Sequence, residues 1–471
     1  MNLRGKTVLV LGMGETGLSM AKWLSRCGAN VRAADSRSEP PCLAALKQSL
    51  PKARIYEGAF DAEAFSGIDL IGISPGVPLA EPLVSQAIRI GIPVVGDMEL
   101  FALAMQQLGV SRPKIVGITG SNGKTTVTAM VGAMIKKAGW DVEVAGNIGP
   151  AVLDALMRRE DAGTRPQAWV LEVSSFQLET TRSLPTDAAT VLNVSEDHFD
   201  RYAGMEDYAA AKARIFLDSS PDGPSGQRGA TTQVLNRDDA VVHAMALRGR
   251  TQVTFGSGVP AEDDDYGLLR ERGDIWLVQG KRRLMRVNEL AVTGLHNATN
   301  ALAALALCRA IGLPLEPLLE ALREFKGLPH RMEEVAVIDG VTFYDDSKGT
   351  NVGSTVAALG GLARPVVLIA GGDGKGQNFS PLAEPIASYA RAVVLIGRDA
   401  KKIAAVLGRC DVPLYFAAAM EEAVQRGFGL AKRGDAVLLS PACASLDMFR
   451  NYVHRAEVFV AAVRALPKEV Q

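Results

Sequence analysis

The chain has 471 residues, which is enough for two to four domains with substantial hydrophobic cores. Its 51 Lys and Arg residues are balanced by 52 Asp and Glu residues. The basic surplus of a nucleic-acid-binding protein is therefore missing, and a small-molecule substrate is favoured. The five cysteines are scattered and form no C-x-x-C pair, which indicates a reducing compartment and argues against a zinc site.

The N-terminus begins with positive residues, but its apolar run is interrupted by glycines and lacks a cleavage-like site, so it reads as a first strand. No apolar run of 18 residues occurs elsewhere, and no membrane span is expected. We therefore expect a cytoplasmic protein.

The first predicted elements have the order of a nucleotide-binding α/β domain. An apolar strand at 7–11 leads into a glycine-rich turn and a helix, and a second strand at 29–34 ends beside Asp35. Dinucleotide-binding folds keep an acidic residue there for a ribose hydroxyl. A nicotinamide-dependent oxidoreductase is therefore one hypothesis, although the same turn also serves other nucleotides. A further strand at 70–73 ends in the loop 74–78, at the sheet edge where such folds bind ligands.

The most informative stretch covers residues 114–126, where a short apolar strand is followed by the turn T-G-S-N-G-K-T-T and a helix. The two glycines allow backbone N–H groups to surround an anion, the helix N-terminus adds partial positive charge, and Lys124 adds a full charge. Thr125 would be placed to coordinate magnesium. The strict phosphate-loop pattern has glycine where this chain has Ile118, so an ordinary strand-to-helix turn is the alternative.

Two later strands end in groups that could bind ions. Glu172 follows an apolar run and is a candidate magnesium ligand, with a solvent-facing carboxylate on an edge strand as the alternative. His198 lies in one loop with Glu196, Asp197 and Asp200, which is either an ion-binding corner or ordinary loop polarity.

Other polar residues are less informative by themselves. Lys212 lies in a predicted helix and, taken alone, reads as a surface lysine. Asn297 and Asn300 open an apolar helix, where capping is the first interpretation and ligand binding the second. Residues 328–331 follow a helix that we expect to end at Gly327, and they are predicted to be the hinge into a third domain.

Strands and helices alternate along the chain, which predicts an α/β fold with parallel sheets covered by helices. We expect three domains: a Rossmann-like domain over residues 1–95, a central domain of the phosphate-loop ATPase type over 96–327, and a Rossmann-like C-terminal domain over 328–471.

These motifs resemble the Mur ligase family over essentially the whole chain. The turn at 117–126 is similar to the ATP loop of Mur ligases and folylpolyglutamate synthetases, which departs from the strict pattern in the same way. The run L-S-P-A-C-A-S-L-D at 439–447 is the stretch most specific for members that add D-glutamate, and the N-P-R signature of the diamino-acid-adding members does not occur in the sequence. The other similar stretches are 145–149, 171–179, 193–201, 327–331, 345–354 and 371–375.

The resemblance implies ATP-dependent amide formation in peptidoglycan precursor synthesis, and hence a role in cell-wall growth and division. The carboxylate of UDP-N-acetylmuramoyl-L-alanine would attack the γ-phosphate of ATP, and the amine of D-glutamate would attack the resulting acyl phosphate. Cations and helix N-termini must cancel the repulsion between carboxylate and phosphate. The implied cofactors are ATP, two Mg²⁺ ions and carbon dioxide, held as a carbamate on Lys212.

The resemblance also implies roles for individual residues. The catalytic residues would be Lys124, His198, Lys212 and Lys348, and the metal ligands Thr125, Glu172, His198 and Lys212. ATP would be bound by Gly120, Ser121, Asn122, Gly123, Lys124, Thr125, Thr126, Asn297, Asn300, Arg331 and Asp346. The UDP substrate would be bound by Met13, Glu15, Thr16, Asp35, Ser36, Arg37, Ser74, Asn147 and His198. D-Glutamate would be bound by Thr350, Lys375, Ser445 and Tyr452.

Two of these assignments carry a physical consequence. A free lysine with a pKa of about 10.4 stays cationic and cannot bind magnesium, whereas its carbamate is an anionic oxygen ligand. Glu15 departs from what the resemblance implies for a diphosphate site, because an acid near a diphosphate is unfavourable unless it points away.

Since the ligand groups come from separate domains, closure about the hinge at Gly327 must assemble the site.

We expect a monomer. The alternatives are a sister ligase that takes another amino acid, an NAD-dependent oxidoreductase built on the first domain, and a nucleotide-binding switch without enzymatic activity.

Overall fold

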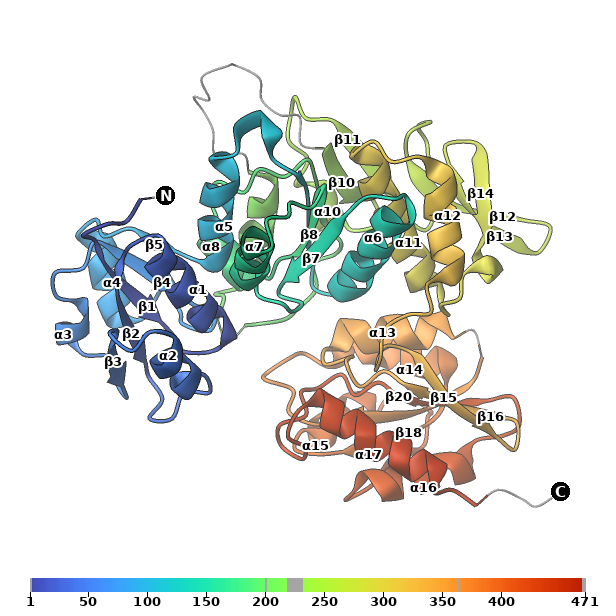
Figure 1. Cartoon of the computed structure of the whole chain (residues 1–471). Coiled ribbons are helices and arrows are strands. Elements are labelled where there is room, and N and C mark those ends of the chain that lie inside the picture. Colours follow the sequence, from blue (N-terminus) through green and yellow to red (C-terminus); the bar gives the residue numbers. More distant parts are fainter. Residues whose placement is uncertain (1, 200, 218–231, 363, 468–471) are drawn as a thin grey trace.

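The computed structural model describes residues 2–199, 201–217, 232–362 and 364–467. The chain folds into three α/β units, each built on its own sheet (Figure 1). The predicted fold class is confirmed, while the domain boundaries at 95/96 and 327/328 stay predictions. Among the described residues, no helix is long and apolar enough to cross a membrane.

The first unit is a parallel sheet with strand order β3-β2-β1-β4-β5. Because the order reverses between β1 and β4, a ligand crevice is expected outside the carboxyl ends of these two strands. Its elements are β1 (Thr7–Leu11), α1 (Glu15–Arg26), β2 (Asn30–Asp35), α2 (Leu43–Ser49), β3 (Arg54–Glu57), α3 (Ala62–Phe65), β4 (Leu70–Ile73), α4 (Pro82–Arg89) and β5 (Val94–Val95).

The second unit has a nine-stranded sheet of order β14-β13-β12-β11-β10-β9-β6-β8-β7. The elements are α5 (Asp97–Gln106), η1 (Gly109–Ser111), β6 (Lys114–Thr119), α6 (Lys124–Lys137), β7 (Val142–Gly146), α7 (Val152–Asp161), β8 (Ala168–Glu172), α8 (Ser175–Glu179), β9 (Ala188–Val191), α9 (Met205–Ala213), η2 (Arg214–Phe216), β10 (Thr232–Asn236), α10 (Ala240–His243), β11 (Gln252–Phe255), β12 (Tyr266–Glu271), β13 (Asp274–Gln279), β14 (Arg282–Arg286), η3 (Val287–Glu289), α11 (Leu295–Ala310) and α12 (Leu315–Glu324).

The third unit has a six-stranded sheet of order β15-β16-β20-β17-β18-β19. The elements are β15 (Glu333–Ile338), β16 (Val341–Asp345), α13 (Val352–Gly361), β17 (Val366–Gly371), η4 (Ser380–Leu382), α14 (Ala383–Tyr389), β18 (Ala390–Ile396), α15 (Ala400–Leu407), β19 (Leu414–Phe416), α16 (Met420–Leu430), β20 (Ala436–Leu439) and α17 (Tyr452–Arg464).

The structure corrects three local expectations. The strands β12, β13 and β14 form an antiparallel meander and β15 pairs antiparallel with β16, so the second and third sheets are mixed at their edges. Helix α12 ends at Glu324, before Gly327. The N-cap of α11 is Gly294, so Asn297 and Asn300 lie inside the helix rather than at its cap.

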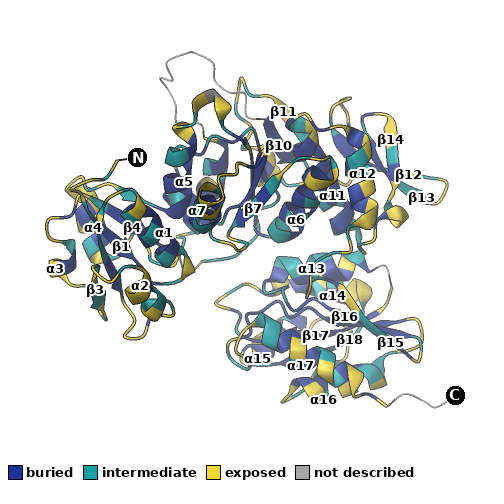
Figure 2. Ribbon diagram, in the orientation of Figure 1, coloured by how far each residue is buried: buried dark blue, intermediate teal, exposed yellow. Residues whose placement is uncertain are grey.

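The two joints between the units differ in kind. Helix α1 of the first unit packs on α5 and α7 of the second, within one continuous hydrophobic cluster. The third unit meets the second mainly where α13 approaches α11 and the loop before α6 (Figure 1). Figure 2 shows that the buried residues concentrate in the sheets and on the helix faces that cover them, whereas outer helix faces are exposed.

Candidate active site

The phosphate loop connects β6 to α6 and forms a cradle for an anion. Gly120 and Gly123 adopt positive φ angles of 150° and 82°, and Gly123 is the N-cap of α6. The Lys124 ammonium donates to the carbonyl oxygens of Gly120 (2.8 Å) and Ser121 (3.0 Å). Burial lowers the pKa of Lys124, while Glu172 and Asp197 oppose that shift. The lysine is thus held inside the loop, where a phosphate oxygen would replace the carbonyls.

Asn193 holds this loop from the opposite side. Its Oδ1 accepts a hydrogen bond from Asn122 N (2.8 Å), and its Nδ2 donates to Asn122 O (3.1 Å). Gly123 has a φ of 82°, which favours glycine, and a Cβ there would lie only 2.8 Å from Asn300 Oδ1 on α11. The structure therefore brings Asn300 against the predicted phosphate site.

The oxygen groups beside the loop suit a magnesium ion. Glu172 is 1% exposed and ends β8, which lies between β6 and β7, so the interpretation as a solvent-facing edge carboxylate is wrong. Its Oε1 accepts from Asn147 Nδ2 (2.6 Å), and its Oε2 is buried without a hydrogen-bond partner in the described part of the chain. A buried carboxylate oxygen with no partner is costly unless a cation binds it. Thr125 Oγ1, the other predicted ligand here, accepts from Arg331 Nη2 at 2.8 Å.

His198 and its loop face the same region. His198 has a φ of 58°, its ring lies 4.7 Å from that of Phe176, and its Nε2 lies 3.6 Å from Asp197 Oδ2. Burial lowers the pKa of His198, while Asp197 opposes this shift. A neutral imidazole is the form that can bind a metal ion. Asp200 lies outside the described residues.

Lys212 is buried rather than on the surface, so the surface interpretation of this residue is wrong. It is 1% exposed, its Nζ donates to Gly120 O at 2.9 Å, and the Nζ lies 4.3 Å from the centre of the Tyr208 ring. Burial, and then the positive charge of Lys124, lower the pKa of Lys212 well below its ordinary value. A lowered pKa favours the neutral amine, which is the form that reacts with carbon dioxide.

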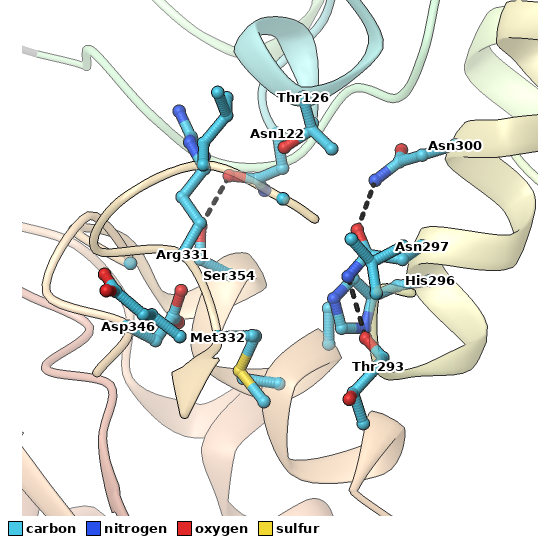
Figure 3. Close-up of a pocket in the computed structure, with 18 of the residues that line it drawn as sticks. Asn122, Thr126, Thr293, His296, Asn297, Asn300, Arg331, Met332, Asp346 and Ser354 are labelled. Atoms are coloured by element: carbon cyan, nitrogen blue, oxygen red, sulfur yellow. Dashed lines mark hydrogen bonds between the residues drawn. The ribbon is translucent and has the colours of Figure 1, made fainter. Parts of the chain in front are cut away.

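A cavity of about 560 Å³ lies between the second and third units (Figure 3). Asp346 is buried there, and burial raises its pKa to about 7 although Ser440 Oγ donates to its carboxylate at 2.7 Å. Burial lowers the pKa of Arg331, which projects toward the phosphate loop. Predicted ATP-binding residues that line this cavity are Asn122, Gly123, Thr126, Asn297, Asn300, Arg331 and Asp346.

The first unit gathers its predicted residues at the carboxyl ends of β1, β2 and β4. The Asp35 carboxylate accepts from Met13 N (2.6 Å), from Arg37 N (2.9 Å) and from the Arg37 guanidinium (2.7 and 2.8 Å). Burial opposes ionisation of Asp35, but these donors together lower its pKa to about 2. Ser74 Oγ donates to Gly12 O (3.0 Å). Glu15, Ser36 and Arg37 are exposed and Thr16 is half-buried.

The predicted D-glutamate residues come from separate loops of the third unit. Tyr452 opens α17, and Lys348 Nζ lies 3.8 Å from the centre of its ring. Burial lowers the pKa of Lys348 to about 8. An isolated antiparallel bridge between residues 373 and 444 joins the loop that carries Lys375 to the loop that carries the buried Ser445. Thr350 lies on the segment between Lys348 and α13, and its N donates to Lys348 O (2.9 Å).

Sequence reasoning missed several residues that shape the site. These are Asn193, Tyr208, Asn351 and Ser354, which contact the phosphate loop or Lys212. Asn351 caps α13 by accepting from Ser354 N at 2.9 Å. The spacing of an asparagine and a serine at a helix start could have indicated that cap, but not the contact with the phosphate loop.

The fold and the site define a three-domain α/β protein of the phosphate-loop class, with a cavity shared by two domains. Three family models match the chain: "Mur ligase MurD-like, N-terminal domain" over residues 6–96, "Mur ligase middle domain" over 118–308, and "Mur ligase, glutamate ligase domain" over 330–443. The chain therefore belongs to the Mur ligase family.

Curated relatives resemble the chain over their full length. The UDP-N-acetylmuramoylalanine–D-glutamate ligase of Nitrosospira multiformis is 69% identical over 99% of this chain and 97% of its own. The enzyme of the same name from Nitrosomonas europaea is 60% identical over 100% of this chain and 98% of its own.

Solved structures share the fold at low sequence identity. MurF of Acinetobacter baumannii superposes with a TM-score of 0.60 at 17% identity, covering 98% of this chain and 91% of that one. The UDP-N-acetylmuramate–alanine ligase of Thermotoga maritima gives a TM-score of 0.58 at 19% identity, covering 98% and 99%.

Proposed function

We propose that this chain is the ATP-dependent ligase that joins D-glutamate to UDP-N-acetylmuramoyl-L-alanine, with release of ADP and phosphate. The observation that carries the proposal is the shared cavity, in which the phosphate loop of the second unit meets Arg331 and Asp346 of the third. Relatives named for this reaction, at 69% and 60% identity over the full length, support the choice of amino acid and nucleotide.

The phosphate loop would hold the transferring group of ATP. The N–H groups of the loop, the N-terminus of α6 and Lys124 supply positive potential at this point. Lys124, which now donates to two carbonyl oxygens of its own loop, would turn to the phosphate. Asn297 and Asn300 on α11 line the same cavity and would bind the rest of the nucleotide.

The donor set fits a magnesium ion with oxygen ligands. Thr125 Oγ1 and Oε2 of Glu172, which has no hydrogen-bond partner among the described residues, would hold one ion. His198 with a carbamate of Lys212 would hold a second. Bound magnesium neutralises the charge of the phosphates and of the attacking carboxylate. Arg331, now hydrogen-bonded to Thr125, would be released to contact the nucleotide.

We propose further that Lys212 is carbamylated. The neutral amine would attack the carbon of carbon dioxide and lose one proton to solvent, which leaves an anionic N-carboxylate. Two observations support this assignment: deep burial lowers the pKa of Lys212 and so disfavours the ammonium ion, and the positive charge of Lys124 disfavours a second cation and favours an anion at this place.

The other two substrates would approach from the outer units. The crevice after β1 and β4 would hold the uridine diphosphate, and the loops with Thr350, Lys375 and Ser445 would bind the carboxylates of D-glutamate, with Tyr452 at the edge and Lys348 nearer the phosphates. A cation and hydroxyl groups are suitable partners for a dicarboxylate. Both carboxylate oxygens of Asp35 already accept hydrogen bonds from Met13 and Arg37, so Asp35 would hold these two residues at the uridine site rather than accept a ribose hydroxyl itself. We also propose that the enzyme acts as a cytoplasmic monomer.

The direct test is phosphate release from ATP by the purified chain with UDP-N-acetylmuramoyl-L-alanine and magnesium. We expect release that depends on D-glutamate and is absent when either the amino acid or the uridine nucleotide is omitted. A preference for a neutral or a diamino acid would assign the chain to a related ligase that adds another amino acid. Phosphate release that does not depend on any amino acid would indicate a nucleotide-binding switch.

The carbamate has its own test. Lys212→Ala should lose activity and recover part of it when short carboxylic acids are added, because their carboxylate can occupy the place of the carbamate. Lys114→Ala, an exposed lysine on β6, serves as the control and should need no rescue. Full activity of Lys212→Ala without added acid would contradict the assignment.

A further inference from the structure

The first turn of α13 contacts the phosphate loop across the joint between the second and third units. Ser354 Oγ donates to Asn122 Oδ1 (2.7 Å), and Asn351 Nδ2 donates to the same oxygen (3.0 Å). Asn351 Nδ2 also lies 3.3 Å from Asp197 Oδ2, beside His198. Figure 3 shows the bond between Ser354 and Asn122 at the wall of the cavity. The third unit is therefore hydrogen-bonded directly to a residue of the phosphate loop.

Close packing makes this contact specific. A Cβ at Gly353 would lie 3.0 Å from Asn122 Nδ2 and 3.0 Å from Ser195 Oγ, so a side chain there would press on both loops. Asn351 is 6% exposed, and its Oδ1 accepts from Ser354 N as the N-cap of α13. The amide of Asn351 thus uses its oxygen within its own helix and both donors across the joint.

The same turn is also hydrogen-bonded, through Gln377, to the two loops that carry the predicted D-glutamate-binding residues Lys375 and Ser445. Val352 N donates to Gln377 Oε1 (3.0 Å), and Gln377 Nε2 donates to Gly374 O (3.0 Å) and lies 3.3 Å from Ala442 O. Gly374 precedes Lys375, and Ala442 lies in the loop after β20 that also contains Ser445. A continuous set of hydrogen bonds therefore runs from the phosphate loop through α13 to both loops.

We propose that Asn351, Ser354 and Gln377 are positioning residues that couple occupancy of the phosphate loop to the affinity for the incoming amino acid. The inference rests on the proposed function and deepens it. A nucleotide that favours the closed joint would fix α13 against Asn122, and the loops held by Gln377 would then be ordered for D-glutamate. Because coupling between two binding sites is reciprocal, D-glutamate would tighten nucleotide binding by the same factor.

Two substitutions separate this contact from folding. Asn351→Asp keeps the helix cap, since aspartate caps as well as asparagine, but it replaces the donating NH2 group by one oxygen that faces Asn122 Oδ1 and Asp197 Oδ2. Ser354→Ala removes one donor and leaves the helix intact. Asn451→Asp is the matched control, because Asn451 caps α17 in the same unit by accepting from His454 N (2.9 Å).

The experiment measures the dissociation constant of D-glutamate by calorimetry, with the uridine substrate present, with and without a non-hydrolysable ATP analogue and magnesium. We expect the analogue to tighten D-glutamate binding in the unaltered chain and in Asn451→Asp. The ratio of the D-glutamate dissociation constants without and with the analogue should fall to about one in Asn351→Asp. In Ser354→Ala this ratio should decrease about two- to tenfold, as expected for the loss of one hydrogen bond. The midpoint of thermal unfolding should stay unchanged in Ser354→Ala.

Two results would overturn the inference: no coupling in the unaltered chain, or the same coupling in Ser354→Ala and Asn351→Asp as in the control. Should Asn351→Asp fail to fold, Ser354→Ala decides. Phosphate release by the unaltered chain distinguishes a failure of the proposed function from a failure of this inference. If the unaltered chain shows no release that depends on D-glutamate, the proposed function fails. If it is active and coupling persists in the variants, only this inference fails.

Discussion

The joint between the first and second units is apolar, whereas the joint between the second and third is polar. The first buries Trp23 of α1, Phe101 of α5 and Leu153 of α7 in one continuous hydrophobic cluster. The second is made of hydrogen bonds such as Arg331 to Thr125 and Ser354 to Asn122, beside an open cavity.

The difference indicates which joint moves. Separating an apolar joint exposes hydrophobic surface to water, at about 25 cal/mol for each Å². The hydrogen bonds of a polar joint can be exchanged for bonds to water at little net cost. We therefore expect the first joint to keep a fixed distance from the proposed uridine site to the phosphate loop, and the second joint to open for ligands and close around them.

The largest effect is expected at the phosphate loop, next to the polar joint. Lys124→Ala should lower kcat at least about 100- to 1000-fold, because it removes the cation that we propose binds the transferring phosphate. The free energy of unfolding should change little. Lys114→Ala removes the same charge at the start of β6, the strand that precedes the loop, where Lys114 pairs with Asp187, and it should leave kcat unchanged. Near-normal turnover of Lys124→Ala would exclude the assigned role.

The apolar joint should respond in stability. Trp23 is 6% exposed and lies one turn before Arg26, which pairs with Asp161 at the end of α7. Trp23→Ala should lower the free energy of unfolding by about 3–5 kcal/mol in a denaturant titration. The KM for D-glutamate should stay close to that of the unaltered chain. A cost below 1 kcal/mol would show that the apolar joint is not a fixed connection.

A titratable group at the apolar joint predicts a pH dependence. Burial raises the pKa of Asp97, at the start of α5, from 3.8 to about 6, although Gln177 donates to its Oδ2 (2.9 Å). The folded chain therefore binds more protons than the unfolded chain between these values, so stability falls as the pH rises through this window. Relative to Asp97→Asn, the unaltered chain should lose up to about 3 kcal/mol from pH 4 to above 6. Parallel pH profiles of the two proteins would contradict this expectation.

The smallest effect is expected for an exposed ion pair at the same joint. Arg26→Ala removes contacts to Glu160 and Asp161, whose side chains are 43% and 63% exposed. Exposed pairs contribute about 0–1 kcal/mol, so the free energy of unfolding should change by less than 1 kcal/mol. A larger loss would mean that charge, and not apolar packing, holds this joint.

Local signals in the sequence predicted the three α/β units and the phosphate loop. Apolar runs of four to six residues mark buried parallel strands, and the glycines with Lys124 mark the anion cradle. The antiparallel strands were not recognised, because β14 reads R-R-L-M-R and lacks a buried apolar run. The roles of single residues came from family resemblance and remain proposals, although the structure shows that Lys212 is buried.

Contacts over long sequence separations could not be predicted. Asn122 and Ser354 are 232 residues apart, and nothing in either segment indicates that the other is its partner. The buried Oε2 of Glu172 depends likewise on the placement of β8 between two other strands. Such facts follow from tertiary packing, which local patterns do not encode.

The most direct test of the two-joint account is a pair of distance measurements on labelled protein, one pair of labels across each joint. Labels on the first and second units should keep their distance when an ATP analogue, magnesium and D-glutamate are added. Labels on the second and third units should move to a single shorter distance. A constant distance across the polar joint, or a ligand-dependent change across the apolar joint, would contradict the account.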